Sequence, residues 1–203
     1  FGPGGIRHFE DIPVTEQFTK GELGWDAVDR PDTGKFVKSL YTNQDKFQRM
    51  GLHAPVALKG GEAEVKWVLP DGQDYVVNGK RTENPPLFEH AQVNHYALRS
   101  LDSFLIKRAR GRANHSSHVL GLEYWDRFDL NDEPDTSIQR YAEATRAVKA
   151  DILANPEIAR LHESSVRWHR QKAQSLHLDP EQGDLVQSLE ARIQAVRPRP
   201  MPT

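Results

Sequence analysis

Residues 94–111 read NHYALRSLDSFLIKRARG, and the change of pattern inside this stretch decides how the chain folds. Ala91 to Tyr96 has the β-like character of a short strand. Helical spacing then begins, carried by Leu98, Leu101, Phe104, Leu105 and Ile106. Ser100 is a suitable N-cap, and Gly111 suits the position after a last helical turn. The sequence therefore predicts a short strand that leads directly into a helix at about 100–110.

The chain differs on the two sides of this stretch. Residues 1–33 are rich in Gly, Pro and Asp and are predicted to be mostly irregular. Short strands are predicted at 35–41 and 53–58, and a hairpin around Pro70-Asp71-Gly72. After residue 112 we expect a loop with a short helical turn, and then helices at Ser137–Ala154, Pro156–Ser175 and Pro180–Val196. This order is α+β locally, and it contains no run of βαβ units.

Apolar residues recur through the second of these three helices and supply its apolar positions. They are Ile158, Leu161, Val166, Trp168 and Leu176.

The composition excludes several classes of protein. The chain has 203 residues, no cysteine and a formal net charge of −2. Disulfides, thiolate zinc sites and cysteine nucleophiles are therefore excluded, and no bulk attraction to nucleic acid is expected. No apolar run approaches the roughly 20 residues of a membrane span. We expect a soluble, cytoplasmic protein without an integral membrane segment.

His95 is the first candidate for chemistry, because it lies where the predicted strand meets the predicted helix. Such junctions commonly carry ligands, and an imidazole nitrogen can bind a divalent metal or a proton. His53, beside a turn, is a second candidate metal or sugar contact. A purely structural role is the simpler alternative for both.

The predicted helix is strongly basic. Five cations oppose the single acid Asp102, which gives a local charge of five minus one, or +4; the cations are Arg99, Lys107, Arg108, Arg110 and Arg112. Guanidinium groups match phosphate and carboxylate oxygens, so one interpretation is a contact with a diphosphate or an acidic sugar. The other is a solvated face whose cations favour the helix C-terminus. The sequence leaves both open.

Other polar residues offer weaker candidates. Glu16 lies in the irregular N-terminal region and would suit a general base for a sugar hydroxyl, with Glu10 and Asp11 as competitors. Tyr124 and Trp125 would suit either stacking on a sugar or the core. The acids from Asp126 to Asp135 are expected to form caps and turns before the helix at 137.

Several of these segments, taken in order, resemble a family of enzymes. The most specific is N-H-Y-x-x-R-S-x-x-x-F-x-x-K-x-x-R-G at 94–111. The others are Phe1-Gly2, Val14 to Thr19, Val37-Lys38-Ser39, Gly51 to Pro55, and the stretch from Tyr124 to Ile138. Over roughly residues 1–140 they are similar to the later part of bacterial family 2-like glycosyltransferases, the group akin to family 92.

The resemblance implies a GT-A-type fold that transfers a sugar from a nucleotide-sugar donor to a glycan acceptor, as in cell-surface polysaccharide biosynthesis. It implies Mn²⁺ or Mg²⁺, with His95 as the best match for a metal-binding histidine and His53 as second. Lys107 and Arg110 would contact the diphosphate or pack the helix, and Glu16 is the candidate base. The block also carries Asn94, Tyr96, Arg99 and Ser100 as candidate substrate contacts.

The sequence departs from the family pattern at one point, because it has no D-x-D motif on a strand. We therefore expect a part of a larger enzyme, inactive in isolation, rather than a degenerate relative. Residues 1–112 would be the acceptor-side part of the catalytic domain, residues 113–196 a helical extension and 197–203 a disordered tail. The N-terminal half of the same protein would be the missing partner. The alternative function is a non-catalytic module that binds an acidic or phosphorylated glycan through the basic helix.

Overall fold

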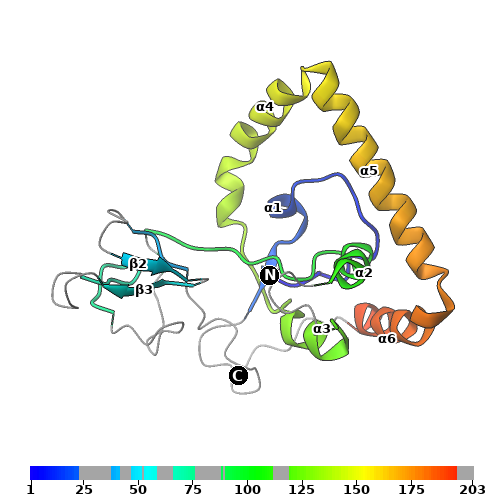
Figure 1. Cartoon of the computed structure of the whole chain (residues 1–203), viewed down its shortest axis with the longest axis horizontal. Coiled ribbons are helices and arrows are strands. Elements are labelled where there is room, and N and C mark those ends of the chain that lie inside the picture. The colour runs from blue at the N-terminus through cyan, green and yellow to red at the C-terminus, as the bar shows by residue number, and fades with distance from the viewer. Residues whose placement is uncertain are drawn as a thin grey trace. The chain divides into compact units, whose positions relative to one another are not determined.

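The computed structural model describes residues 1–22, 38–41, 47–51, 53–58, 66–75, 88, 90–111 and 119–195. The chain mixes helices and short strands, which confirms the α+β class. It divides into two compact units, one made of Phe1–Leu23 with His95–Thr203 and the other of Gly24–Asn94. Figure 1 shows their elements, and each unit is described by itself below.

The first unit is mainly helical. Its α-helices are α1 (Val14–Gln17), α2 (Leu101–Arg110), α3 (Leu122–Phe128), α4 (Ala142–Leu153), α5 (Pro156–His177) and α6 (Gly183–Gln194). Short 3₁₀ turns, η3 (Ser137–Tyr141) and η4 (Pro180–Gln182), precede α4 and α6. The three predicted C-terminal helices are therefore confirmed. Two-residue strands, β1 (Lys20–Gly21) and β4 (Glu133–Pro134), pair antiparallel and join the N-terminal segment to the residues between α3 and η3.

The helix α2 begins and ends where its sequence predicts. The Ser100 hydroxyl accepts a hydrogen bond from the Ser103 backbone N–H at 3.3 Å, which satisfies one free donor of the first turn. Gly111 follows the last turn with a φ of 79°, a conformation that favours glycine, and its N–H bonds to the Lys107 carbonyl.

The core of this unit lies between α2, α3, α5 and α6. Trp125 of α3 has no exposed surface and packs edge-on against Phe104 of α2, with ring centres 5.1 Å apart. Leu176 of α5 and Leu189 of α6 complete the same cluster. Because α2 shares its core with the C-terminal helices, the expected division at residue 112 does not separate two compact units.

Three of the apolar positions of α5 are exposed. Ala173 and Leu176 are buried, but Ile158, Leu161 and Trp168 are 41%, 51% and 57% exposed. Ile158 precedes Leu176 by five full turns and lies on the same face, so burial in α5 depends on closeness to the core at the C-terminal end of the helix.

The N-terminal segment is irregular, as predicted, and it crosses the helices. The backbone carbonyls of Ile6 and Arg7 accept the N–H groups of Leu101 and Asp102 at the start of α2, each at 3.1 Å. Further on, the Asp11 carboxylate pairs with Lys149 of α4 and His162 of α5. This segment, blue in Figure 1, therefore connects α2, α4 and α5.

Among its described residues, the second unit has one antiparallel pair of strands, β2 (Phe47–Met50) and β3 (Pro55–Leu58), with Phe47 opposite Leu58. The strand β3 confirms the prediction at 53–58. The predicted hairpin is present as a single bridge between Val68 and Asp74, with Gly72 at a φ of 84° in the turn. Its outer residues, and residues 35–37 of another predicted strand, lie outside the described residues.

Two predicted strands are not found where the structure can test them. Residues 38–41 and 91–96 are not part of any helix or strand. An extended segment becomes a strand only when a second one pairs with it, and no described strand lies along 91–96. His95 therefore precedes a helix but does not lie at the end of a sheet, which corrects the expected junction.

Within the ranges that the structure covers, no helix is both long enough and apolar enough to cross a bilayer.

Candidate functional site: a cationic cavity beside α2

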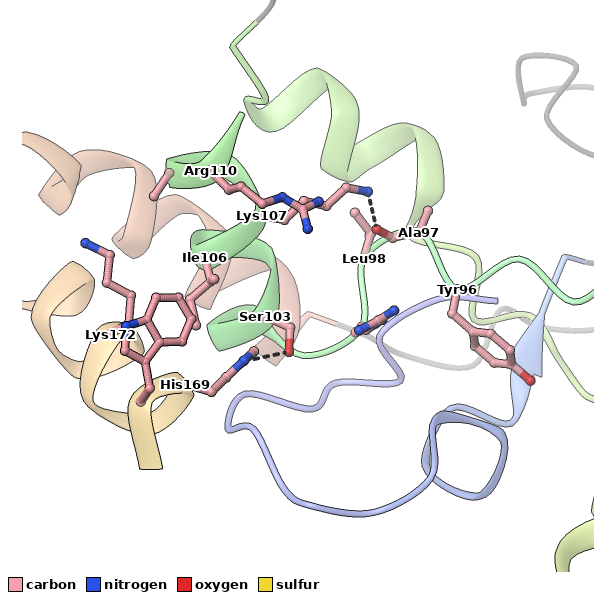
Figure 2. A pocket seen from close by; sticks show the side chains of 12 residues that line it. Tyr96, Ala97, Leu98, Ser103, Ile106, Lys107, Arg110, His169 and Lys172 are labelled. Atoms are coloured by element: carbon pink, nitrogen blue, oxygen red, sulfur yellow. Dashed lines mark hydrogen bonds between the residues drawn. The ribbon is translucent and has the colours of Figure 1, made fainter. Parts of the chain in front are cut away.

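A cavity of about 710 Å³ lies between α2, α5 and the residues just before α2 (Figure 2). The basic block, meaning the cation-rich residues 99–112, and α5 both contribute side chains to it. It is lined by Tyr96, Ala97, Leu98, Arg99, Ser103, Ile106, Lys107, Ala109, Arg110, Trp168, His169 and Lys172. The cavity lies entirely within the first unit.

The charge of the cavity has one sign. Four cationic side chains line it, Arg99, Lys107 and Arg110 from the basic block and Lys172 from α5, and none of the described lining residues is acidic. Cations gathered on the wall of a cavity raise the local concentration of anions. The arrangement therefore suits an anionic ligand.

Two of the cations predicted in the basic helix hold the fold together. The Lys107 ammonium donates to the Ala97 carbonyl at 2.7 Å and to the Tyr124 hydroxyl at 2.9 Å. Arg108 donates to the Leu120 carbonyl and, at 3.0 Å, to the Gln182 side chain. Of the two roles expected for Lys107, packing of the helix is the one that its contacts show.

Arg99 and Arg110 are different, because neither forms an ion pair with another described residue. Arg99 also has a φ of 62°, and it is the only non-glycine residue with a positive φ in the described ranges. That backbone conformation is costly for a residue with a Cβ, and it occurs often at functional sites. Arg112 lies outside the described residues.

His169 enters the cavity from α5. Its Nε2 lies 3.3 Å from the Ser103 hydroxyl, and its ring packs on Phe9 with centres 3.9 Å apart. Burial lowers the pKa of His169, Asp102 opposes this effect, and the charge of Arg99 lowers the pKa further. The imidazole is therefore held neutral near neutral pH, and it can exchange a hydrogen bond with Ser103.

Trp168, His169 and Lys172 are lining residues that the sequence analysis missed. Trp168 was predicted only as an apolar position of α5. It is 57% exposed and lies one turn from Lys172 on the same side of the helix. The sequence shows that these two residues are four positions apart on a predicted helix, but it does not show that this side of α5 faces α2.

The other predicted site residues lie in three places. Tyr96 lines the cavity and packs against Phe1, with ring centres 5.0 Å apart. Ser100 is 1% exposed and its hydroxyl caps α2, so it is not accessible to a ligand. Asn94 lies in the second unit, where its side chain accepts a hydrogen bond from Gln92.

Glu16 lies in α1 and does not line the cavity. One of its carboxylate oxygens pairs with Arg146 of α4 at 2.7 Å. The other is buried without a hydrogen bond to a described residue. The expected general base is thus a carboxylate of the N-terminal segment that is held by an arginine of α4.

The two predicted metal-binding histidines belong to different units. His95 is exposed and its ring meets Phe128 edge-on at 5.5 Å, while the His53 carbonyl accepts hydrogen bonds from Ser39. No three His, Asp or Glu side chains among the described residues are arranged to hold a metal ion. The described residues therefore offer at most one ligand beside His95.

The two aromatic residues considered for sugar stacking are used internally. Trp125 is fully buried in the core, and the Tyr124 hydroxyl bonds to Lys107.

Comparison of the chain with protein-family models, curated proteins and solved structures found no match in any of the three.

Proposed function

We propose that this chain is the acceptor-side part of a cytoplasmic glycosyltransferase of the GT-A type, with its donor half in another segment of the same protein. The enzyme would transfer a sugar from a nucleotide-sugar to a glycan, assisted by Mn²⁺ or Mg²⁺. His95 would supply one metal ligand, and the remaining ligands would come from outside the described residues.

The observation that carries this proposal is the cationic cavity. The most specific part of the resemblance, residues 94–111, contributes Tyr96, Arg99 and Arg110 to a single cavity without lining acids. Both substrates of such an enzyme can carry negative charge, as the diphosphate of a donor or as an acidic group on an acceptor. Preorganised cations offset that charge without reorganising during the reaction.

The second candidate function is a non-catalytic module that binds an acidic glycan. One observation favours it: Glu16, the candidate base, does not line the cavity and is paired with Arg146. A carboxylate held in this way stabilises the attachment of α1 to α4 and needs no catalytic role.

The test is an assay of the complete gene product that contains these 203 residues. It should release UDP or GDP from a nucleotide-sugar in the presence of Mn²⁺, and His95→Ala should abolish that release. Glu16→Gln should lower the rate of transfer to a glycan only if Glu16 acts as the general base, so an unchanged rate would assign Glu16 to its ion pair with Arg146. His90→Gln, another histidine ahead of α2, is the matched control and should leave activity unchanged. Absence of nucleotide release from any donor would exclude the glycosyltransferase and leave the binding module.

A further inference from the structure

We propose that the cavity beside α2 binds an acidic oligosaccharide, with one sugar ring on Trp168 and the acidic groups on Arg99 and Arg110. The inference deepens the proposed function and rests on it, because it takes the cavity as the site of the acceptor. It assigns the acceptor to the class of glycans that carry carboxylate or phosphate groups.

The first argument is the type of cation available. Lys107 is held by Ala97 and Tyr124, which leaves Arg99, Arg110 and Lys172 to face a ligand. A guanidinium presents parallel N–H donors that match the two oxygens of a carboxylate or of a phosphate. Two arginines without an ion pair to a described residue therefore favour planar or tetrahedral oxyanions over neutral hydroxyl groups.

The second argument is the aromatic side chain. Trp168 lines a cavity whose charged groups are all cationic, and it leaves more than half of its surface exposed. One face of a sugar ring carries C–H groups and packs well on an indole, which is large, flat and rigid. A ligand that covers Trp168 and also meets the arginines has both an apolar face and a negative charge.

The third argument is length. Arg99 precedes the first turn of α2, and Arg110 lies in its last turn. The ten residues of α2 extend over about 15 Å, since an α-helix rises 1.5 Å per residue. The cations are therefore distributed along the cavity rather than gathered at one point, and this distribution suits acidic groups on successive sugar units.

The experiment is a calorimetric titration of the complete 203-residue chain with four probes. These are a trisaccharide of galacturonate, the matching neutral trisaccharide of galactose, UDP-galactose and sodium sulfate. We expect the acidic trisaccharide to bind at least tenfold more tightly than the neutral one. We also expect UDP-galactose not to displace it.

Variants separate the two contacts. Trp168→Ala should weaken the acidic trisaccharide at least fivefold and leave sulfate unchanged, whereas Arg110→Gln should weaken both probes. Leu161→Ala is the matched control, because Leu161 lies two turns earlier on α5, is 51% exposed and does not line the cavity. It should leave both affinities unchanged.

Three results would overturn the inference. Displacement of the trisaccharide by UDP-galactose would assign the cavity to the donor and leave the proposed function intact. Equal affinity for the acidic and neutral trisaccharides would show that the arginines do not select acidic groups. Sulfate binding without any effect of Trp168→Ala on the trisaccharide would show that the cavity holds anions but no sugar ring. Nucleotide release by the complete gene product tests the proposed function separately.

Discussion

Arg99 combines a strained backbone with a charge that faces the cavity, and the two properties can be separated by mutation. Its φ of 62° costs a residue with a Cβ about 1–2 kcal/mol, whereas glycine adopts this conformation freely. We predict that Arg99→Gly keeps or raises the free energy of unfolding, by up to about 1 kcal/mol, and weakens sulfate binding at least fivefold. Urea unfolding and calorimetry measure the two effects.

The control is Arg99→Ala, which removes the charge and keeps the Cβ. It should lose the same sulfate affinity as Arg99→Gly but should be the less stable of the two variants. Equal stability of the glycine and alanine variants would show that the backbone at this position is not strained in solution.

His169 predicts a pH dependence whose sign follows from its surroundings. Its pKa in the folded chain lies below the ordinary value of 6.5, so the unfolded chain binds the proton more readily. The contribution of His169 to stability is therefore complete above pH 6.5. It is lost progressively as the pH falls from 6.5 toward the folded pKa.

The measurement is urea unfolding of the wild type and of His169→Gln at pH 7.5, 6.5 and 5.5. As the pH falls, the free energy of unfolding of the wild type should decrease more than that of the glutamine variant. Contributions from other titrating groups are common to both proteins and cancel in this difference. Parallel pH profiles would show that the folded chain does not depress the pKa of His169.

Single residues also show what the sequence can and cannot specify about the site. The excess of positive charge around α2 is visible in the sequence, and two of its arginines do line the cavity. Sequence could not show that Lys107 and Arg108 bond to Ala97, Tyr124 and Leu120, because those partners are set by packing. Nor could it bring His169 to Ser103, 66 residues away.

At the scale of elements, the contact of the N-terminal segment with the residues between α3 and β4 depends on one glycine. The Gly2 N–H bonds to the carbonyls of Lys20 at 3.0 Å and Leu130 at 2.8 Å. A Cβ at Gly2 would overlap the Leu130 backbone and the Asn131 side chain. Since a backbone cannot rotate away, we predict that Gly2→Ala lowers the free energy of unfolding by about 1–3 kcal/mol.

The matched control is a glycine-to-alanine change that should raise the free energy of unfolding. Gly183 begins α6 with helical dihedral angles, and no atom lies within 4 Å of a Cβ placed there. Gly183→Ala should raise the free energy of unfolding by about 0.4–1 kcal/mol, because alanine has less freedom to lose on folding. If both variants lose stability equally, the close contact at Gly2 is not the cause.

The helices were predictable and the strands largely were not, and the reason is physical. Ser100, Asn155 and Pro156 determine helix starts through contacts within one turn, so local sequence is sufficient. A strand needs a partner from elsewhere in the chain. The pairing of β1 with β4 joins residues more than 110 positions apart. Residues 91–96 have β-like composition, but no described strand pairs with them.

At the scale of the whole molecule, the division into units is discontinuous in sequence. Phe1–Leu23 belongs with His95–Thr203, and Gly24–Asn94 forms a second unit between them. The family resemblance predicts a boundary at residue 112, where the acceptor-side part would end. In the structure, α2 and the C-terminal helices instead bury one shared core.

This organisation predicts that residues 24–94 can be removed without loss of the cavity. Every lining residue belongs to the first unit, and so does every member of the core around Trp125. The two cut ends are also close, because Gly2 bonds to the Lys20 carbonyl while the neighbouring Phe1 bonds to the His95 carbonyl. A linker of six Gly and Ser residues spans up to about 20 Å and is sufficient.

The shortened chain should keep its helical circular dichroism, unfold cooperatively in urea and bind sulfate within threefold of the full chain. A second deletion of residues 178–203 is the control, since it removes α6 and with it Val186 and Leu189 of the core. That variant should lose cooperative unfolding. If removal of 24–94 also abolishes cooperative unfolding, the first unit depends on the second for its stability, and the cavity cannot be treated as the property of one unit.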